Sequence, residues 1–288
     1  MSFSCPVNDL IKARFSCRSY ESKPVAPSLL FNLENFIQTS LQPPFGSKVR
    51  YIITAASDSA RRELKNLGTY GYIKGSSAFI IGVVKRGEKD LEDFGYTLEQ
   101  IILSATDQGL GTCWLGGTFT RSTFNQKINP ARDEIFPAAV SLGYPALDPG
   151  ISSKLIRRAV GAQRRFPWET LFFKGAFGNS LLPESAGAYT IPLEMLRLAP
   201  SASNKQPWRV LLQDNAFHFY LQRTPAYPGF LATTFLGVAD IQRVDMGIAM
   251  CHFELSAREQ GLQGRWVVSQ PSQKSPPHTE YSASWIIK

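Results

Sequence analysis

The sequence predicts an α+β protein made of two homologous halves, each containing a β-sheet and a long helix. Residues 103–114 (LSATDQGLGTCW) return as residues 255–266 (LSAREQGLQGRW), with Leu, Ser, Ala, Gln, Gly, Leu and Trp at matching positions. In the same ungapped register, Gly95 aligns with Gly247. Two similar helices that each end at a glycine would explain only the glycines. The match along the whole string therefore indicates an internal duplication.

The same elements are expected in the same order in both halves. Apolar residues three or four apart predict one helix per half, ending at a glycine: Leu98, Ile101, Ile102 and Ala105 before Gly109, and Met246, Ala249, Met250, Phe253 and Leu255 before Gly261. Short runs rich in β-branched and aromatic residues predict strands around each helix, at 51–53, 79–84 and 138–142, and at 208–212, 217–221 and 282–287. The result is two sheet-plus-helix units.

The segment between the two units reads as a linker. Residues 174–190 (KGAFGNSLLPESAGAYT) are rich in Gly, Ser and Pro, which favours loop structure. We therefore expect a first half at 1–174, a linker at 175–190 and a second half at 191–288. Fused halves of this kind carry inside one chain the interface that joins two subunits of a symmetric dimer. The expected assembly is an intramolecular pseudo-dimer that stays monomeric.

Composition excludes several classes of protein. Hydrophobic residues make up 43% and charged residues 19% of the 288-residue chain, which is ordinary for a globular protein. The longest apolar run, residues 78–84, is far shorter than the roughly 20 residues of a membrane span, and no signal peptide is recognisable. Four dispersed cysteines and three histidines lack disulfide or metal-ligand spacing. We expect a cytoplasmic protein with no membrane partner and no structural metal.

The chain is basic, with a formal net charge of +8. An excess of this kind favours an anionic partner, although a solvated basic surface explains it as well. The basic residues form scattered pairs such as Arg157-Arg158 and Arg164-Arg165. No nucleic-acid recognition motif accompanies them, so we expect no nucleic acid and favour an anionic cofactor.

Three segments have the composition of a binding site. The first is Arg14-Phe15-Ser16-Cys17-Arg18, followed by Lys23-Pro24-Val25. Two guanidinium groups four residues apart, with a serine between them, could converge on one phosphate. A pair of surface salt bridges is the alternative interpretation.

The second segment is a string of small polar residues bracketed by prolines just before a predicted strand. It could present hydrogen-bonding groups to a polar heterocycle or a polyol, or it could be an ordinary Ser/Asn turn. The residues concerned are Pro200, Ser201, Ala202, Ser203, Asn204 and Gln206.

The third segment, residues 109–117 (GLGTCWLGG), ends in two glycines that would let a ligand approach the backbone. It is not a dinucleotide fingerprint, because the predicted helix precedes the glycines. Cys113 could be a nucleophile, but no histidine is placed to activate it, and a buried structural cysteine is the alternative.

Together these strings resemble the FMN-dependent nitroreductase family. The resemblance rests on R-x-S-x-R followed by K-P-V, on APSASNKQPWR and on GLGTCWLGG, and it extends to FPAAVSLGYP at 136–145 and GAQRRFPWETLFF at 161–173. It covers most of the chain, and the best fit is the branch in which two family-like halves share one polypeptide. The resemblance implies the nitroreductase fold, FMN as cofactor, NAD(P)H as reductant and a small-molecule electron acceptor.

The resemblance also implies roles for individual residues. Arg14, Phe15, Ser16 and Arg18 would hold the FMN phosphate and ribityl chain, with Arg164 or Arg165 adding positive charge. The 200–206 string would line the ribityl chain and the ring edge. Leu115, Gly116 and Gly117 would present backbone N–H groups near flavin N5, where the chemistry resides. No side chain is expected to act as a general acid.

The order of the motifs departs from the usual family pattern. In the first half, residues 39–45 (TSLQPPF) stand where family members carry A-P-S-x-x-N, and the intact string lies in the second half. The second half in turn lacks R-x-S-x-R. We therefore expect one flavin per chain, bound between the halves. The alternatives are a flavin-binding or flavin-consuming relative without nicotinamide turnover, and a non-catalytic descendant that binds another anionic ligand.

Overall fold

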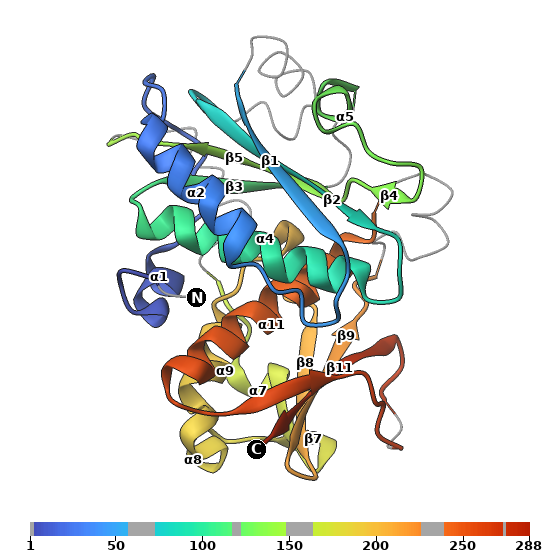
Figure 1. Ribbon diagram of the computed structural model, residues 1–288. Coiled ribbons are helices and arrows are strands. Elements are labelled where there is room, and N and C mark those ends of the chain that lie inside the picture. Colours follow the sequence, from blue (N-terminus) through green and yellow to red (C-terminus); the bar gives the residue numbers. More distant parts are fainter. Residues whose placement is uncertain (1–2, 57–72, 117–121, 148–163, 226–238, 273–274) are drawn as a thin grey trace.

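Two sheets enclose a central pair of helices. The computed structural model describes residues 3–56, 73–116, 122–147, 164–225, 239–272 and 275–288. Helices α4 (Asp90–Asp107) and α11 (Ile241–Glu259) cross in the middle of the molecule, with one sheet on either side (Figure 1). The order of layers is therefore sheet, helix, helix, sheet. The predicted α+β class with two sheet-plus-helix units is confirmed.

The first sheet is built by the first half of the chain. Its order is β1-β2-β5-β3, with antiparallel neighbours and a short β4 that also pairs with β2. The strands are β1 (Val49–Ala55), β2 (Ala78–Lys85), β3 (Gly111–Gly116), β4 (Glu134–Ile135) and β5 (Ala138–Gly143). All three strands predicted for this half are present, whereas β3 and β4 are additional.

The second sheet repeats this order and extends it. Its first four strands, β8-β9-β11-β10, follow one another as β1-β2-β5-β3 do, and β6 and β7 are added beside β8. This shared topology supports the duplication inferred from the repeat. The strands are β6 (Phe172–Lys174), β7 (Ala176–Ser180), β8 (Trp208–Gln213), β9 (Ala216–Gln222), β10 (Gly264–Val267) and β11 (Thr279–Ile287).

The segment expected to be a linker carries regular structure. Phe172 pairs with Val210, so β6 lies parallel to β8, and β7 folds back against β6. Strands of the second sheet thus begin before residue 174, and helices follow directly after β7. A composition rich in Gly and Ser did not reveal this, because sheet pairing with a distant strand overrides weak local preference. The division at 174 and 190 stays a prediction.

Shorter helices surround the central pair. They are α1 (Val7–Ala13), α2 (Pro27–Thr39), α5 (Ser122–Ile128), α7 (Trp168–Leu171), α8 (Pro183–Ala186) and α9 (Thr190–Arg197), together with the 3₁₀ turns η1 (Gly187–Tyr189) and η2 (Ala202–Asn204). Their apolar patterns are short, which is why the sequence did not reveal them.

The two predicted central helices end where expected, and in the same way. Gly109 and Gly261 have left-handed φ values of 73° and 75°. Beyond each glycine a leucine N–H returns to a helix carbonyl, Leu110 to Ala105 and Leu262 to Ala257, both at 2.9 Å. This is the Schellman arrangement that a C-terminal glycine permits. At its start, α11 is capped by Asp240, whose carboxylate accepts from the N–H of Gln242.

The central helices touch backbone to backbone at the repeat-related glycines. A Cβ placed on Gly95 would lie 2.1 Å from the carbonyl oxygen of Val244, and one on Gly247 would lie 2.0 Å from that of Glu92. The two contacts are reciprocal, because Glu92 and Val244 are themselves aligned in the repeat. The two helices therefore cross at the pseudo-twofold axis between the halves, and only glycine fits at positions 95 and 247.

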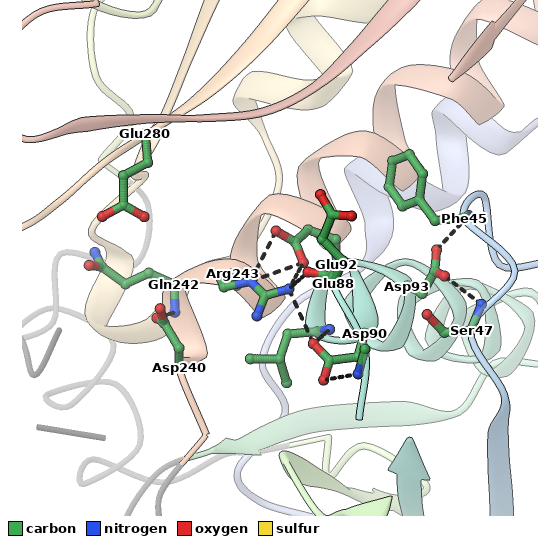
Figure 2. A network of polar contacts seen from close by, with 12 residues as sticks. Phe45, Ser47, Glu88, Asp90, Glu92, Asp93, Asp240, Gln242, Arg243 and Glu280 are labelled. Atoms are coloured by element: carbon green, nitrogen blue, oxygen red, sulfur yellow. Dashed lines mark hydrogen bonds and ion pairs between the residues drawn. The ribbon is translucent and has the colours of Figure 1, made fainter. Parts of the chain in front are cut away.

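A buried ion cluster joins the halves next to this crossing. The Arg243 guanidinium of α11 donates to the Glu92 carboxylate at 2.5 and 3.1 Å and to the carbonyl of Glu88 at 2.5 Å (Figure 2). It also pairs with Asp90 at 3.1 Å. The side chain of Glu92 is 4% exposed and that of Arg243 18%, so solvent screens these charges weakly. Removal of the arginine would leave buried carboxylates without a partner.

Candidate functional site

The arginine motif lies beside an edge strand of the first sheet. Arg14 is the C-cap of α1, and the following residues run alongside β3, with Ser16 bridged to Thr112 and the Cys17 N–H donating to the Thr112 carbonyl at 2.8 Å. The Arg14 side chain is 6% exposed, which argues against a surface salt bridge. Phe15 remains 39% exposed, while the Arg18 guanidinium donates to the carbonyl of Ser16 at 3.4 Å.

Repeat-related acids hold the N-terminal segment that carries this motif. Asp107 at the end of α4 accepts from the Ser4 N–H at 2.7 Å and from its hydroxyl at 2.6 Å. Its counterpart Glu259, at the end of α11, accepts from the N–H groups of Val7 and Asn8, the first residues of α1. A carboxylate at a helix N-terminus satisfies free amides and complements the helix dipole. The motif is thereby fixed to both halves.

The 200–206 string is a strained, internally bonded loop. Ser203, Asn204 and Gln206 adopt left-handed φ values of 50°, 55° and 49°, which non-glycine residues rarely do without a constraint from their surroundings. The Ser201 hydroxyl accepts from the Gln206 N–H at 2.8 Å, and the Gln206 amide donates to the Asn204 carbonyl at 3.0 Å. Pro200, Ser201 and Ala202 are half-buried and Gln206 is buried. Such concentrated strain is typical of functional loops.

This loop holds the arginine pair in place. The Asn204 amide donates to the Arg164 carbonyl at 2.8 Å, and its oxygen accepts from Arg165 at 3.4 Å. Gln206 accepts from the Phe166 N–H at 2.8 Å. Arg164 is exposed, whereas Arg165 is half-buried and also donates to the Leu198 carbonyl at 3.0 Å. The polar side chains of the loop thus position Arg165.

Arg165 lies within the electrostatic reach of Arg14. Burial lowers the pKa of Arg165, and the charges of Arg14 and then Arg197 lower it further. Arg197 is neutralised by Glu194 at 2.7 Å. Arg14 therefore lies close enough to Arg165 to repel it. Its Nε is buried and makes no hydrogen bond. A buried and a half-buried guanidinium group that repel each other make this region a candidate site for an anion.

The end of β3 differs in part from the expectation. Leu115 is fully buried, which leaves only its backbone to face a ligand. A Cβ on Gly116 would lie 2.6 Å from Cδ1 of Ile241 on the second half, so a larger residue there would displace the end of that side chain. Gly117 lies outside the described residues. Burial raises the pKa of the Cys113 thiol although Arg18 and Arg14 oppose this, so a structural cysteine fits better than a nucleophile.

Aligned aspartates anchor the equivalent loops of the two halves. Asp245 of α11, 2% exposed, accepts from the Ala202 N–H at 3.0 and 3.2 Å. Asp93 of α4 accepts from the N–H groups of Phe45 and Ser47 at 2.9 and 2.8 Å (Figure 2). The segment expected to replace the APSASN string in the first half is thus held by the aspartate that matches Asp245. The repeat alignment of these acids was the sequence signal for this role.

Two buried residues near Arg14 belong to no recognisable sequence motif. Glu99 of α4 and His252 of α11 are both fully buried and lie 2.9 Å apart. Glu99 also pairs with Arg14 at 3.5 Å. Only the tertiary structure reveals this group, because its members come from three distant segments.

The described residues meet the requirements of neither a metal cluster nor a membrane-spanning helix. Within those residues, no group of three or more His, Cys, Asp or Glu side chains is arranged to hold a metal ion. No described helix has both the length and the hydropathy needed to cross a bilayer.

Known proteins provide a direct comparison. The family described as "Putative TM nitroreductase" matches residues 7–257. A "putative nitroreductase" from Thermotoga maritima has a similar structure, with a TM-score of 0.60 and 21% identity over 100% of this chain and 96% of that chain. An FMN-bound nitroreductase from Desulfitobacterium hafniense gives a TM-score of 0.42 and 17% identity over 50% of this chain and 91% of its own. No curated protein matches the sequence.

The family match spans most of the chain, and the Thermotoga structure shares the fold along its whole length. The resemblance seen in the sequence is therefore confirmed at the level of family and fold. The chain belongs to the "Putative TM nitroreductase" family of nitroreductase-fold proteins.

Proposed function

We propose that this chain is an FMN-dependent oxidoreductase. It would take a hydride from NAD(P)H and pass electrons to a nitro compound, a quinone or a similar small acceptor. The observation that carries the proposal is the proximity of Arg14 to Arg165, whose guanidinium is held by Asn204 of the second half. Burial and mutual repulsion of these guanidinium groups suit a phosphate monoester, which binds arginine through paired charge-assisted hydrogen bonds.

The residues present fit FMN in three ways. Arg14, Arg18 and Arg165 would bind its phosphate, with Ser16 between the first two. The strained 200–206 loop, anchored by Asp245, would contact the ribityl chain and the ring edge. The backbone at the end of β3 would approach the ring. When bound, FMN would supply hydride acceptance and donation at N5, while nearby N–H groups and positive charge would favour the reduced, anionic ring.

The asymmetry between the halves supports one flavin per chain. At the pseudo-equivalent position, residues 39–45 (TSLQPPF) stand in place of the APSASN string, and Val268 aligns with the Gly116 that ends β3. We propose that the halves act as an intramolecular pseudo-dimer. The protein would function as a cytoplasmic monomer, with a small-molecule acceptor as its partner and neither nucleic acid nor membrane involved.

Flavin titration and anaerobic reduction test this proposal. The purified chain should bind one equivalent of FMN and bleach on addition of NADH or NADPH. Arg14→Ala and Arg165→Ala should each weaken FMN binding by roughly 10- to 100-fold, because each removes a charge-assisted contact of about 1.5–3 kcal/mol. Arg86→Ala, which removes an exposed arginine beyond β2, is the matched control and should leave the affinity unchanged.

The outcomes separate the alternatives. Bound flavin that does not bleach with either nicotinamide would favour a flavin-binding or flavin-consuming relative. A colourless protein that takes up no FMN would favour a non-catalytic descendant that binds another anion. Two equivalents of FMN per chain would contradict the single site.

A further inference from the structure

Glu99 contacts three side chains from distant parts of the chain. Its carboxylate accepts from the Trp114 indole at 2.8 Å and from His252 Nε2 at 2.9 Å, and it pairs with Arg14 Nε at 3.5 Å. Trp114 lies on β3, His252 on α11 of the second half, and Arg14 just after α1. Glu99 and His252 are fully buried. One carboxylate therefore contacts two basic side chains in a water-free environment.

The hydrogen bonds of His252 define its protonation state. Its Nδ1 lies 3.1 Å from the carbonyl oxygen of Met195, and a carbonyl can only accept, so Nδ1 carries a proton. Its Nε2 faces Glu99 Oε1, and a proton must lie between these two atoms. The hydrogen bond from Trp114 and the positive charge of Arg14 both stabilise the carboxylate form of Glu99. The second proton therefore resides on the ring, and His252 is an imidazolium.

The other titratable groups nearby are already accounted for. Glu254 on α11 is bound by the Tyr96 hydroxyl at 2.7 Å and by Arg258 at 2.6 Å. Burial raises the pKa of the Cys251 thiol well above its ordinary value, and the charges of Glu99 and Glu254 add to this, so the thiol is neutral. Among the described residues, Glu99 is the acid that balances the imidazolium.

We propose that His252 is a positioning residue that keeps the positive charge of Arg14 available to the FMN phosphate. This inference rests on the proposed function. With His252 protonated, Arg14, His252 and Glu99 carry a net charge of +1. With a neutral residue at 252, Glu99 would cancel Arg14 alone, and the charge at the anion site would be lost. The second half would thus control the affinity of an arginine in the first half without touching the ligand.

A comparison of two flavins tests the proposal. His252→Gln keeps a donor near Glu99 but removes the charge. In chain freed of bound flavin, this variant should weaken FMN binding on the order of tenfold and leave the affinity for riboflavin, which has no phosphate, unchanged. The matched control is His218→Gln, at a buried histidine bonded to Ser284 on the second sheet. It should change neither affinity.

A rescue variant and a spectroscopic measurement complete the test. Adding Glu99→Gln to the His252→Gln chain removes the carboxylate that neutralises Arg14, so FMN affinity should recover, whereas a purely structural role predicts further loss. Independently, ¹⁵N NMR of the folded wild-type chain should show both His252 ring nitrogens protonated, because both face acceptor oxygens.

An equal loss for FMN and riboflavin, no rescue, or a neutral ring in the NMR spectrum would each overturn the inference. If the wild-type chain binds neither flavin, the proposed function fails, while the NMR result still decides the charge of His252.

Discussion

Replacing Gly95 with alanine should push the two central helices apart. A Cβ at Gly95 would lie 2.1 Å from the carbonyl oxygen of Val244, and a Cβ at Gly247 would lie 2.0 Å from that of Glu92. Ordinary Cβ contacts begin at 3.4 Å, so the backbones would have to separate by about 1.3 Å. Both clashing atoms are backbone, and neither can rotate away as a side-chain end could.

Two opposing effects set the size of the change. Overpacking in a core costs about 1–3 kcal/mol and sometimes more, and the neighbours Phe94, Leu98 and Met250 are fully buried. A cost of roughly 3–4 kcal/mol is therefore reasonable. Alanine is favoured over glycine inside a helix by about 1 kcal/mol. The steric effect is larger, so Gly95→Ala should lower the free energy of unfolding by about 2–3 kcal/mol and the Tm by roughly 5 °C or more.

Urea unfolding followed by circular dichroism measures this change. Gly87→Ala is the control, because a Cβ there meets no atom within 4 Å, and it should alter stability by less than about 1 kcal/mol. One separation of the helices relieves both clashes. The double variant Gly95→Ala/Gly247→Ala should therefore cost less than the sum of the single variants. Wild-type stability of Gly95→Ala, or strict additivity in the double variant, would refute the close backbone contact.

Two other buried groups give predictions of their own. Arg243→Met should lower the free energy of unfolding by about 3 kcal/mol, because it leaves the buried Glu92 carboxylate without its partner. The Arg258 side chain is 50% exposed, so the control Arg258→Met should lower it by less than about 1 kcal/mol. Urea titrations of the two variants measure the difference. Burial raises the pKa of Asp245 well above its ordinary value, against the hydrogen bond from Ala202, so the folded chain binds this proton more tightly than the unfolded chain. The contribution of Asp245 to the free energy of unfolding should fall as pH rises from the ordinary aspartate pKa towards the raised one. Unfolding measured at several pH values should show this fall in the wild-type chain and not in Asp245→Asn. An identical pH dependence in both chains would contradict the prediction.

Local sequence was sufficient for the elements with strong periodicity. Both central helices and all six predicted strands are present, since a long apolar stripe or a run of β-branched residues specifies its element without distant partners. The 200–206 string contacts Arg165 through Asn204, while the binding roles expected for this string and for the arginine motif stay a prediction. The segment expected to be a linker contains strand β7 and helix α8, and its bounds stay a prediction.

The sequence by itself predicted an α+β protein with two sheet-plus-helix units and a resemblance to the nitroreductase family, since periodicity and motifs can be identified without knowledge of tertiary contacts. Tertiary structure alone decided which groups share a buried space: that Gly95 meets Val244, that Gly116 makes room for Ile241, and that Glu99 connects Arg14 to His252. These contacts join residues far apart in the chain. The strength of these contacts comes from burial, which removes water and its screening of charge. A local pattern of residues does not indicate which groups will be buried together.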